Sequence, residues 1–424
     1  MTIGKKRGRL AVRATVAACL LTGLATTAQA TNGYIANGYG GGAKGMAGAG
    51  VAVPSGVLGL AQNPAMGLKV GNQAGFCLTT FAPDRGFSVS GAGGLQTGTF
   101  KSRNDVFLIP CGGVNFKLGE RSALGLFMFG NGGMNTEYGT NVFVPGYGLA
   151  GTSPLGVNLE QAFFAANFSH QVSETVTLGI APVFALQRFS ATGLENFAPF
   201  SSAPGAMSNN GDDWSTGFGV NVGVLYEPSA QWSFGAAFRS EMQMQKFDKY
   251  AGLFAEQGDF DVPAVATLGA AFRPAANPDL TLTAEYQRIF YGDVKAISNS
   301  SAAILAPFGA DDGPGFGWKD MDVYRLAASY KANDRLTLRG GVSYATKFAK
   351  KQEALFNILA PATPQWHASV GFSYKLENGW GVTGSYTHAF ENSLTGVNPA
   401  LAPTQPVKVR MNQHELALGM TYKW

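Results

Sequence analysis

The sequence feature that most restricts the fold is a repeated alternation of apolar residues with polar or small ones. The last segment, HELALGMTYKW, shows this alternation clearly. Every second residue from Leu416 to Trp424 is apolar, and the residues between them are polar or small. A period of two places all the apolar side chains on one face of a β-strand. Because the same pattern recurs along most of the chain, we predict an all-β protein.

The apolar faces of these strands are predicted to contact lipid. Charged residues make up only 14% of the chain, about half of their share in soluble globular proteins. No run of about 18 apolar residues follows residue 30, so the sequence predicts no transmembrane helix. A weakly charged chain with 57 glycines and many alternating segments is typical of an outer-membrane β-barrel.

The alternating segments predict fourteen antiparallel strands, and an even number is typical of bacterial single-chain barrels. The connections after the second, fourth, sixth, eighth, tenth and twelfth strands are short, and the others are long. Outer-membrane barrels have short periplasmic turns and long external loops in this order. The predicted strands cover residues 72–81, 105–118, 122–131, 161–172, 175–190, 214–228, 231–246, 261–273, 279–293, 321–332, 335–348, 365–376, 379–391 and 411–424.

Residues 1–30 have the pattern of a secretory signal peptide. Basic residues from Lys5 to Arg13 precede an apolar stretch that ends near Leu24, and Ala28-Gln29-Ala30 forms a small-x-small cleavage site. A lipoprotein acylation site ending at Cys19 is the alternative, and it would leave a very short apolar region. Without its five basic residues the formal charge of +4 falls close to neutral, so the mature chain shows no signature of nucleic-acid binding.

The segment that follows, residues 31–71, is rich in glycine and contains the spacing Gly40-x-Gly42-x-x-Gly45. In a dinucleotide-binding site this spacing follows a strand and opens a helix, and neither is predicted here. The segment is also too apolar for a disordered tail. Non-helical backbone is tolerated at membrane depth where protein surrounds it. We therefore predict that residues 31–71 form a plug, or hatch, inside the lumen of a barrel formed by residues 72–424.

Several stretches resemble the FadL family of outer-membrane transporters for long-chain fatty acids and hydrophobic aromatic compounds. They include Asn63-Pro64-Ala65 in the plug and FGWKDMDVYRLAASYKANDRLTLRGGVSYA at 316–345. The resemblance implies a fourteen-stranded barrel closed by an amino-terminal hatch, to which Asn63, Pro64 and Ala65 belong. It also implies capture of an apolar ligand at the external loops and its release sideways, where the third strand bends inward.

A bend in the third strand has a candidate position in the sequence. Gly130, Asn131, Gly132 and Gly133 interrupt the alternation of this strand with residues that pack poorly and permit bulges. The stretch is the predicted lateral opening. The alternative is a glycine-rich strand end that leads into an external loop.

The predicted external loops carry unusually many apolar residues, and Tyr250 to Ala255 have helical spacing. An apolar helix face must be buried against another loop, which leaves an apolar groove for ligand capture. The alternative is loops that pack on one another without a ligand. The predicted groove residues are Phe197, Phe200, Met207, Tyr250, Leu253, Phe254, Phe356 and Ile358.

A fatty acid would need a cation near its carboxylate, whereas an uncharged aromatic compound would not. Strand parity points Arg239, Arg325 and Arg339 into the lumen, and we assign Arg325 and Arg339 as ligand-binding candidates. Glu285 also points inward. The alternative is therefore an ion-pair network across the barrel rather than a ligand site.

Cys77 and Cys111 lie in neighbouring predicted strands, and the oxidising periplasm would allow a disulfide between them. Two unpaired thiols are the alternative.

Of the four histidines only His367 is predicted to face inward, and no serine nucleophile motif stands near a partner. The sequence therefore predicts no enzyme, no metal site and no cofactor.

The sequence predicts a monomeric transporter in the bacterial outer membrane for passive uptake of fatty acids or related hydrophobic molecules. The terminal aromatic residue Trp424 resembles the signal recognised by the barrel assembly machinery. The other expected partners are outer-membrane lipid and the apolar solute, and no nucleic acid is expected. A general pore for polar solutes and a structural or adhesive surface barrel are the alternative functions.

Overall fold

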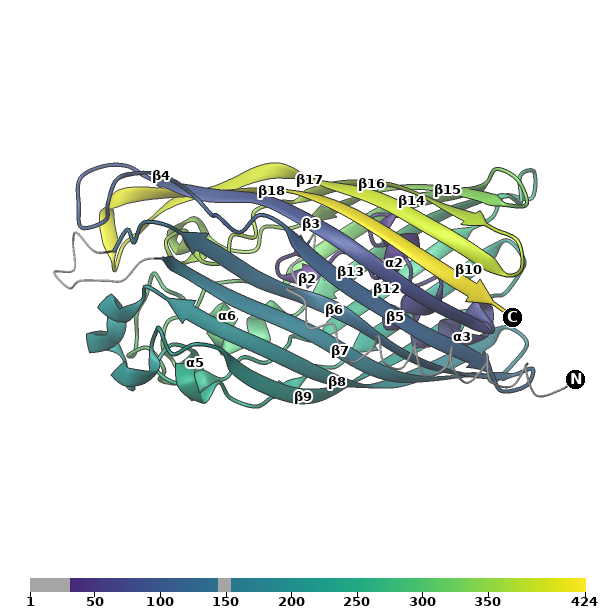
Figure 1. The fold of residues 1–424 in the computed structure, drawn as a ribbon, viewed down its shortest axis with the longest axis horizontal. Coiled ribbons are helices and arrows are strands. Elements are labelled where there is room, and N and C mark those ends of the chain that lie inside the picture. The colour runs from purple at the N-terminus through teal and green to yellow at the C-terminus, as the bar shows by residue number, and fades with distance from the viewer. Residues whose placement is uncertain (1–30, 144–153) are drawn as a thin grey trace, which may run out of the picture.

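A computed structural model describes residues 31–143 and 154–424, so the predicted signal peptide lies outside the described residues. Fourteen of the eighteen strands in these described residues close into one antiparallel barrel, which confirms the predicted fold (Figure 1). Each strand pairs with its neighbour in the chain, and β18 (Ala402–Lys423) closes the barrel by pairing with β3 (Gln73–Val89). The other barrel strands are β5 (Phe107–Lys117), β6 (Ser122–Tyr138), β7 (Leu155–Gln171), β8 (Val176–Thr192), β9 (Asp213–Tyr226), β10 (Trp232–Arg239), β12 (Val265–Phe272), β13 (Leu280–Ile289), β14 (Met321–Lys331), β15 (Leu336–Ala345), β16 (Trp366–Lys375) and β17 (Trp380–Asn398).

The remaining elements are short. Those that precede the barrel are β1 (Thr31–Asn32), β2 (Ile35–Ala36), α2 (Gly40–Lys44), η1 (Val57–Ala61), η2 (Pro64–Met66) and α3 (Gly67–Val70). Those in the connections are β4 (Gly98–Lys101), η3 (Glu195–Phe200), η4 (Pro204–Ala206), β11 (Gln243–Met244), η5 (Asp248–Tyr250), α5 (Ala255–Gly258), η6 (Tyr291–Asp293), α6 (Lys295–Ser298), η7 (Lys351–Glu353) and η8 (Phe356–Ile358).

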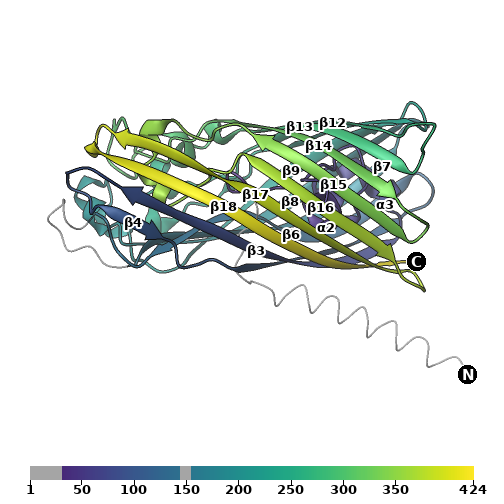
Figure 2. The ribbon, with the colours of Figure 1, turned by 90° about the horizontal axis from the view of Figure 1, so that it is seen from above.

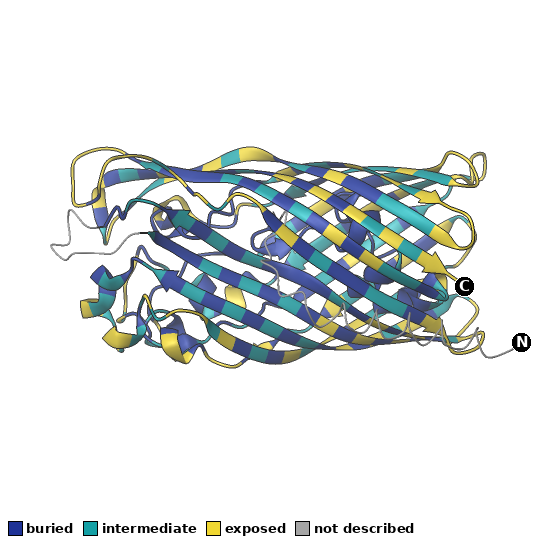
Figure 3. Cartoon of the chain, viewed as in Figure 1, coloured by how far each residue is buried: buried dark blue, intermediate teal, exposed yellow. Residues whose placement is uncertain are grey.

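The barrel wall alternates between exposed and buried residues, as the bands in Figure 3 show. In β18, Leu416, Leu418 and Met420 are 47%, 56% and 50% exposed, whereas Glu415 and Ala417 are 2% and 0% exposed. Apolar side chains thus point outward and polar or small ones inward, as in a barrel that faces lipid. Within residues 31–143 and 154–424, no helix is long and apolar enough to cross a bilayer.

The connections differ in length between the two ends of the barrel (Figures 1 and 2). The C-terminus lies at the end with the six short turns predicted from the sequence, which we call the short-turn end. The helices α5 and α6 lie at the opposite end, which we call the long-loop end. Because consecutive strands run in opposite directions, all the short turns lie at one end of the barrel and all the long loops lie at the other.

One predicted loop is wrong. Residues 392–410 were expected to connect the last two strands, but β17 and β18 continue to a tight turn at 399–401. Val407 and Val409 of the extension point inward and are fully buried, whereas Lys408 and Arg410 face outward. The extension carries polar residues on its outer face and apolar ones inside, which is the reverse of the alternation that identifies lipid-facing strands. The strands β3, β6 and β7 also extend further toward the long-loop end than predicted.

Residues 32–70, which we call the luminal segment, lie inside the barrel (Figure 1) and are largely buried. The predicted hatch residues fasten this segment to the wall. The Asn63 side chain accepts a hydrogen bond from the Ala65 backbone N–H at 3.0 Å and so caps η2, which begins at Pro64. It also donates to the backbone carbonyl of Val224 in β9 at 3.1 Å. A Cβ atom on Gly223 would overlap Asn63, so this close approach requires a glycine in the wall.

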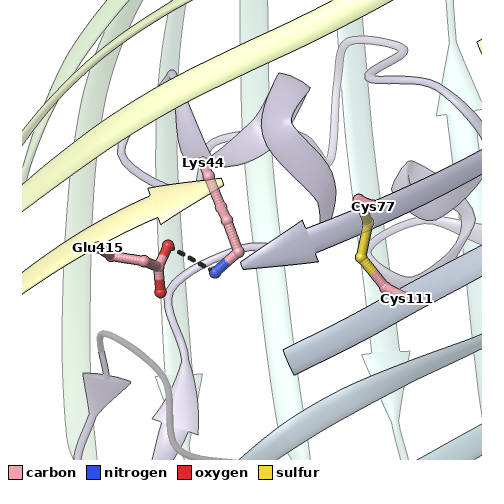
Figure 4. Close-up of a disulfide and its surroundings, with 4 residues drawn as sticks. All are labelled: Lys44, Cys77, Cys111 and Glu415. Carbon is pink, nitrogen blue, oxygen red and sulfur yellow. Dashed lines mark hydrogen bonds and ion pairs between the residues drawn. A yellow bond between two sulfur atoms is a disulfide. The ribbon is translucent and has the colours of Figure 1, made fainter. Parts of the chain in front are cut away.

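Two buried ion pairs join the luminal segment to the wall or lie beside it. Lys44 Nζ lies 2.7 Å from Glu415 Oε1 of β18 (Figure 4). Glu285 Oε1 of β13 lies 2.9 Å from Arg325 Nη1 of β14. The second oxygen of Glu285 accepts hydrogen bonds from the backbone N–H groups of Gly50 and Val51, both at 2.8 Å. Glu285 therefore binds the luminal segment and the wall at the same time.

Candidate functional site

An apolar pocket lies among the loops of the long-loop end, and we call it the capture pocket. Its empty space measures about 470 Å³, part of it open to solvent. Five of the eight predicted groove residues line it. The lining consists of Val157, Phe189, Leu194, Phe197, Met207, Leu253, Phe254, Ala296, Phe308, Pro314, Gly315, Phe316, Phe356 and Leu359.

Aromatic contacts bring distant loops together around the capture pocket. The ring of Phe197 lies 5.5 Å from that of Phe308 and 5.7 Å from that of Phe356, measured between centroids. These three residues come from three different connections. Such pairs add about 0.5–1.5 kcal/mol beyond the burial of their area. Among the described residues, the lining contains no charged or hydrogen-bonding side chain, so the pocket suits an apolar ligand or the apolar part of a larger one.

The other three predicted groove residues do not line the capture pocket. Phe200 is 59% exposed at the end of η3. Tyr250 is buried, and its hydroxyl donates to the Gly211 carbonyl at 2.7 Å and accepts from the Ala191 N–H at 3.1 Å. Burial raises the pKa of this hydroxyl above its ordinary value, so it remains a neutral donor. Ile358 is buried, and its carbonyl accepts from the Tyr138 hydroxyl at 2.7 Å.

The helical spacing from Tyr250 to Ala255 predicted an amphipathic helix, and this prediction is wrong. The region instead forms the short 3-10 turn η5 and the four-residue element α5. Glu256 and Gln257 of α5 have positive φ angles of 56° and 57°. The apolar residues are brought together by packing between loops rather than by a helix face.

A second pocket, the inner pocket, lies at the tip of the luminal segment and occupies about 320 Å³, including open space. Among the described residues that line it, Arg85 carries a guanidinium, Asn135 an amide, Tyr34 a hydroxyl and Trp318 an indole N–H. The rest of the lining is Gly33, Phe81, Gly133, Met134, Ala360, Pro361, Ala362 and Met411.

A short stretch of chain separates the two pockets. Leu359 lines the capture pocket, and the next residue, Ala360, lines the inner pocket. Strand β6 holds this partition, because Thr136 Oγ1 donates to the Leu359 carbonyl at 2.8 Å and the Tyr138 hydroxyl donates to the preceding carbonyl. Since Phe356 and Leu359 line the capture pocket and residues 360–362 line the inner pocket, we call residues 356–362 the partition.

The barrel wall is incomplete beside the inner pocket. Strands β5 and β6 pair only from the short-turn end as far as Gly112 and Met128. Residues 107–111 of β5 continue to pair with β3 but no longer with β6. Nearer the long-loop end the Arg103 N–H donates to the Glu137 carbonyl at 2.8 Å and closes the wall again. We call the interval between residues 107–111 and β6 the wall gap.

Strand β6 bends toward the lumen at the predicted lateral opening, residues 130–133. The register with β7 shifts here and leaves Asn131 in a β-bulge. Gly132 pairs with Ile35 of β2, and the N–H of the next residue donates to the Tyr34 carbonyl at 3.1 Å. The luminal segment thus bonds to the part of β6 that has left β5.

The bulge also directs the Asn131 side chain into the lumen. Its Oδ1 accepts hydrogen bonds from the Tyr39 hydroxyl and from Arg239 Nη1, both at 2.8 Å. Its Nδ2 donates to Gln161 Oε1 at 2.8 Å. The interruption of the strand is therefore coupled to the packing of the luminal segment.

Sequence reasoning did not use Pro110, which lies in the unpaired stretch of β5. Proline has no N–H to donate, and within sheets it is confined mainly to edges, strand starts and bulges. Pro110 in an otherwise alternating strand therefore indicated that β5 lacks a neighbouring strand on one side at this position.

The two arginines predicted to bind ligand do not line the capture pocket or the inner pocket. Arg325 pairs with Glu285 and also donates to Gln287 Oε1 at 2.9 Å and to Asn37 Oδ1 at 3.2 Å. Arg339 Nη1 donates to Ser373 Oγ at 2.7 Å. Arg325 therefore belongs to the network across the barrel that the sequence left open as an alternative.

Cys77 and Cys111 are joined by a disulfide between β3 and β5 (Figure 4). The two residues are direct cross-strand partners with their Cα atoms 5.0 Å apart. Cys111 is the last residue before β5 regains β6 as a partner. The disulfide therefore holds β5 to β3 at the edge of the wall gap.

Replacing both cysteines with alanine is expected to lower the stability of the barrel by about 3–4 kcal/mol, because the disulfide restricts the unfolded chain. Urea unfolding followed by tryptophan fluorescence measures the effect. The wild-type protein treated with dithiothreitol is the control and should match the variant. Equal unfolding midpoints for the oxidised wild type and the variant would contradict this role.

Of the histidines, only His367 is buried, and His170, His388 and His414 lie on the outward face. Within the described residues, no group of three His, Cys, Asp or Glu side chains is placed to hold a metal ion. The polar atoms of the lumen instead bond mainly to one another and to the luminal segment.

A closed fourteen-stranded barrel with an apolar outer face, a lumen filled by its own chain and an apolar pocket among its long loops defines an outer-membrane transport barrel. The chain belongs to the family of outer membrane transport proteins described as OMPP1/FadL/TodX, whose profile matches residues 21–424. It is therefore a multi-pass β-barrel of the bacterial outer membrane. This family consists of transport proteins rather than enzymes.

Solved structures of similar fold include the Pseudomonas putida toluene transporter TodX, with a TM-score of 0.68 and 18% identity over 92% of this chain and 99% of that one. A Pseudomonas aeruginosa FadL homologue has a TM-score of 0.67 and 17% identity, with the same coverage of both chains. The Ralstonia pickettii toluene transporter TbuX has a TM-score of 0.63 and 18% identity, again with the same coverage of both chains. At these identities the likeness concerns the fold. No protein of curated function matches the sequence significantly.

Proposed function

We propose that this protein takes up hydrophobic molecules passively across the outer membrane. The observation that carries the proposal is the capture pocket, whose lining is entirely apolar, at the long-loop end of a barrel with a filled lumen. Such a pocket can bind an apolar solute, while the luminal segment acts as a hatch and leaves no wide aqueous path for polar ones. The external loops therefore select the solute.

The wall gap supplies a route out of the barrel in this proposal. A solute leaves the capture pocket past the partition at residues 356–362, reaches the inner pocket and passes sideways between β5 and β6 into lipid. Burial in hydrocarbon favours an apolar solute by about 0.8 kcal/mol per CH₂ group. Movement down a concentration gradient therefore needs no energy source, and the hatch does not have to leave the barrel.

Family membership and two solved relatives named as toluene transporters support hydrophobic solutes as the transported class. Long-chain fatty acids and aromatic hydrocarbons both have the apolar part that the capture pocket requires. A general pore would need an open lumen, and a surface adhesin would need no apolar path through the barrel.

Uptake measurements test the proposal. Cells that express the protein should accumulate labelled oleate or toluene faster than cells that lack it. The purified protein in a planar bilayer should conduct few ions. Equal accumulation by both cells would refute the transport proposal, and a large steady conductance would favour the polar pore.

A charge placed at the edge of the capture pocket should weaken capture. Leu253 is only partly buried, so Leu253→Asp leaves the carboxylate near water while it faces the ligand. An apolar ligand then loses a contact and must lie beside a charge. We expect the solute concentration for half-maximal uptake to rise about tenfold, which corresponds to about 1.4 kcal/mol.

Leu305→Asp is the matched control, because Leu305 is 83% exposed and lies outside the pocket. It should leave the half-maximal concentration unchanged. If both variants behave alike, the capture pocket is not the site at which the solute first binds.

A further inference from the structure

Arg85 is a buried cation at the junction of the inner pocket and the wall gap. It belongs to the part of β3 that sequence analysis placed in a loop, and it is 3% exposed. Its guanidinium Nη2 donates to the Asn104 carbonyl at 2.6 Å and to Asn135 Oδ1 at 3.1 Å. The guanidinium carbon also lies 5.2 Å from the ring centroid of Phe107, which belongs to the unpaired stretch of β5.

Arg85 has no carboxylate partner. All Asp and Glu residues of the chain lie in the described residues, and none of them lies within ion-pair distance of Arg85 there. Asp84, its neighbour in the sequence, instead lies 3.5 Å from Lys101 and from Arg410, and Asp105 is exposed. The Arg85 Nε atom is buried and has no hydrogen-bond partner among the described residues. Lys44 and Arg325, by contrast, each contact a glutamate. An uncompensated buried charge is costly unless an anion joins it.

The surroundings of Arg85 specify the kind of anion that fits. Apart from Asn135, most of the inner pocket lining is apolar or aromatic, including Phe81, Trp318 and Met411. We propose that Arg85 binds the carboxylate of a ligand with a long apolar chain as this ligand passes from the inner pocket to the wall gap. A planar guanidinium can bond both oxygens of a carboxylate, and the chain can lie along Phe107 toward the lipid.

Arg239 is the other buried arginine without a carboxylate, and its Nε and Nη2 atoms also have no hydrogen-bond partner in the described chain. The cavity beside it is lined by the polar side chains of Gln62, Asn221, Thr267 and Gln287 as well as by apolar ones such as Ile35, Ala61 and Val265. These four polar side chains can hold water. Arg85, in contrast, contacts Phe107 of the unpaired stretch of β5. Its place beside the wall gap therefore distinguishes Arg85 as the site for an amphipathic anion.

The test compares Arg85→Gln with the wild type in the uptake of labelled oleate and of oleyl alcohol, which has the same chain without the charge. We expect oleate uptake to fall about tenfold and oleyl alcohol uptake to change less than twofold, because only the carboxylate loses its partner. Arg85→Lys should restore part of the oleate uptake. Arg339→Gln is the matched control and should leave the ratio of the two rates unchanged.

This inference rests on the proposed transport function, and the two can fail separately. If wild-type cells take up neither compound faster than cells without the protein, the transport proposal fails. If the wild type transports both and Arg85→Gln lowers neither rate, or lowers both equally, the assignment of Arg85 is overturned. A selective loss of oleate uptake in Arg239→Gln instead of Arg85→Gln would also overturn it. If Arg85→Gln does not assemble, the test uses the wild-type protein and compares decanoate with decanol as inhibitors of oleate uptake. Decanoate should inhibit more strongly, because only decanoate carries the carboxylate that Arg85 binds. Equal inhibition by the two compounds would refute the site.

Discussion

The Glu285→Ala variant is expected to conduct ions in a planar bilayer, whereas the wild-type barrel should be nearly silent. Glu285 binds Arg325 at 2.9 Å and the backbone N–H groups of Gly50 and Val51 at 2.8 Å. Its removal leaves Arg325 buried without a counter-charge and frees two backbone donors of the luminal segment. Breaking one side of a buried ion pair costs about 3–5 kcal/mol.

This cost should appear as a looser luminal segment, because the barrel strands keep their own backbone hydrogen bonds. A loss of about 3 kcal/mol makes displacement of the segment about a hundredfold more frequent. Single-channel recording measures the open events, and the heat-dependent migration of the barrel in gels shows that it has assembled. Glu377→Ala is the control, since Glu377 forms only an exposed pair with Arg335 at 3.9 Å and such pairs contribute little. An assembled, silent Glu285→Ala barrel would show that this residue does not hold the hatch.

The Gly132→Leu variant is expected to assemble but to take up hydrophobic compounds about tenfold more slowly. A Cβ atom on Gly132 would overlap the backbone carbonyl of Tyr34 in the luminal segment. The leucine side chain must therefore displace its neighbours at the wall gap. Overpacking of this kind typically costs about 1–3 kcal/mol, enough to change a rate about tenfold or more.

Gly340→Leu provides the comparison for this experiment. A Cβ atom on Gly340 meets only the Ser369 carbonyl, at 3.7 Å, which is an ordinary contact. Uptake by this variant should equal that of the wild type. Conductance of Gly132→Leu must be recorded as well, because a displaced luminal segment would open a leak. Normal uptake by Gly132→Leu would exclude the wall gap as the exit.

The barrel could be predicted because its signal is local. Residues such as Leu416, Leu418 and Met420 face lipid directly, so their spacing in the sequence already records which face of the strand is outside. The six short turns could be predicted as well, because each lies between two alternating segments that are close together in the sequence. The prediction failed where the outer face is polar, at Lys408 and Arg410, because there the apolar residues Val407 and Val409 face inward and the alternation is the reverse of that in a lipid-facing strand.

The candidate site could be predicted only in part. The apolar loop residues Phe197, Phe254 and Phe356 were identified from their composition, and the structure places them around one pocket. Phe200 belongs to the same apolar stretch as Phe197, yet it faces outward. Composition identifies a loop whose apolar side chains must be buried, but the packing of several loops decides which of these side chains face the pocket.

Charge partners could also be predicted only in part. Strand parity placed Arg325 and Glu285 inside the barrel, and their neighbouring strands made an ion pair conceivable. Arg85 was missed because its strand was predicted to end at residue 81. Whether a luminal arginine faces a glutamate or an apolar pocket depends on the register of strands and on where the luminal segment lies.

The sequence by itself determined the strand count, the direction in which the wall residues face and the presence of an apolar segment ahead of the barrel. These properties follow from periodicity and composition over a few neighbouring residues. Only the tertiary structure decided where β5 no longer pairs with β6, how Tyr34 and Ile35 meet that gap and which buried arginines lack a carboxylate partner. The reason is that these features depend on contacts between residues far apart in the chain, which no local pattern contains.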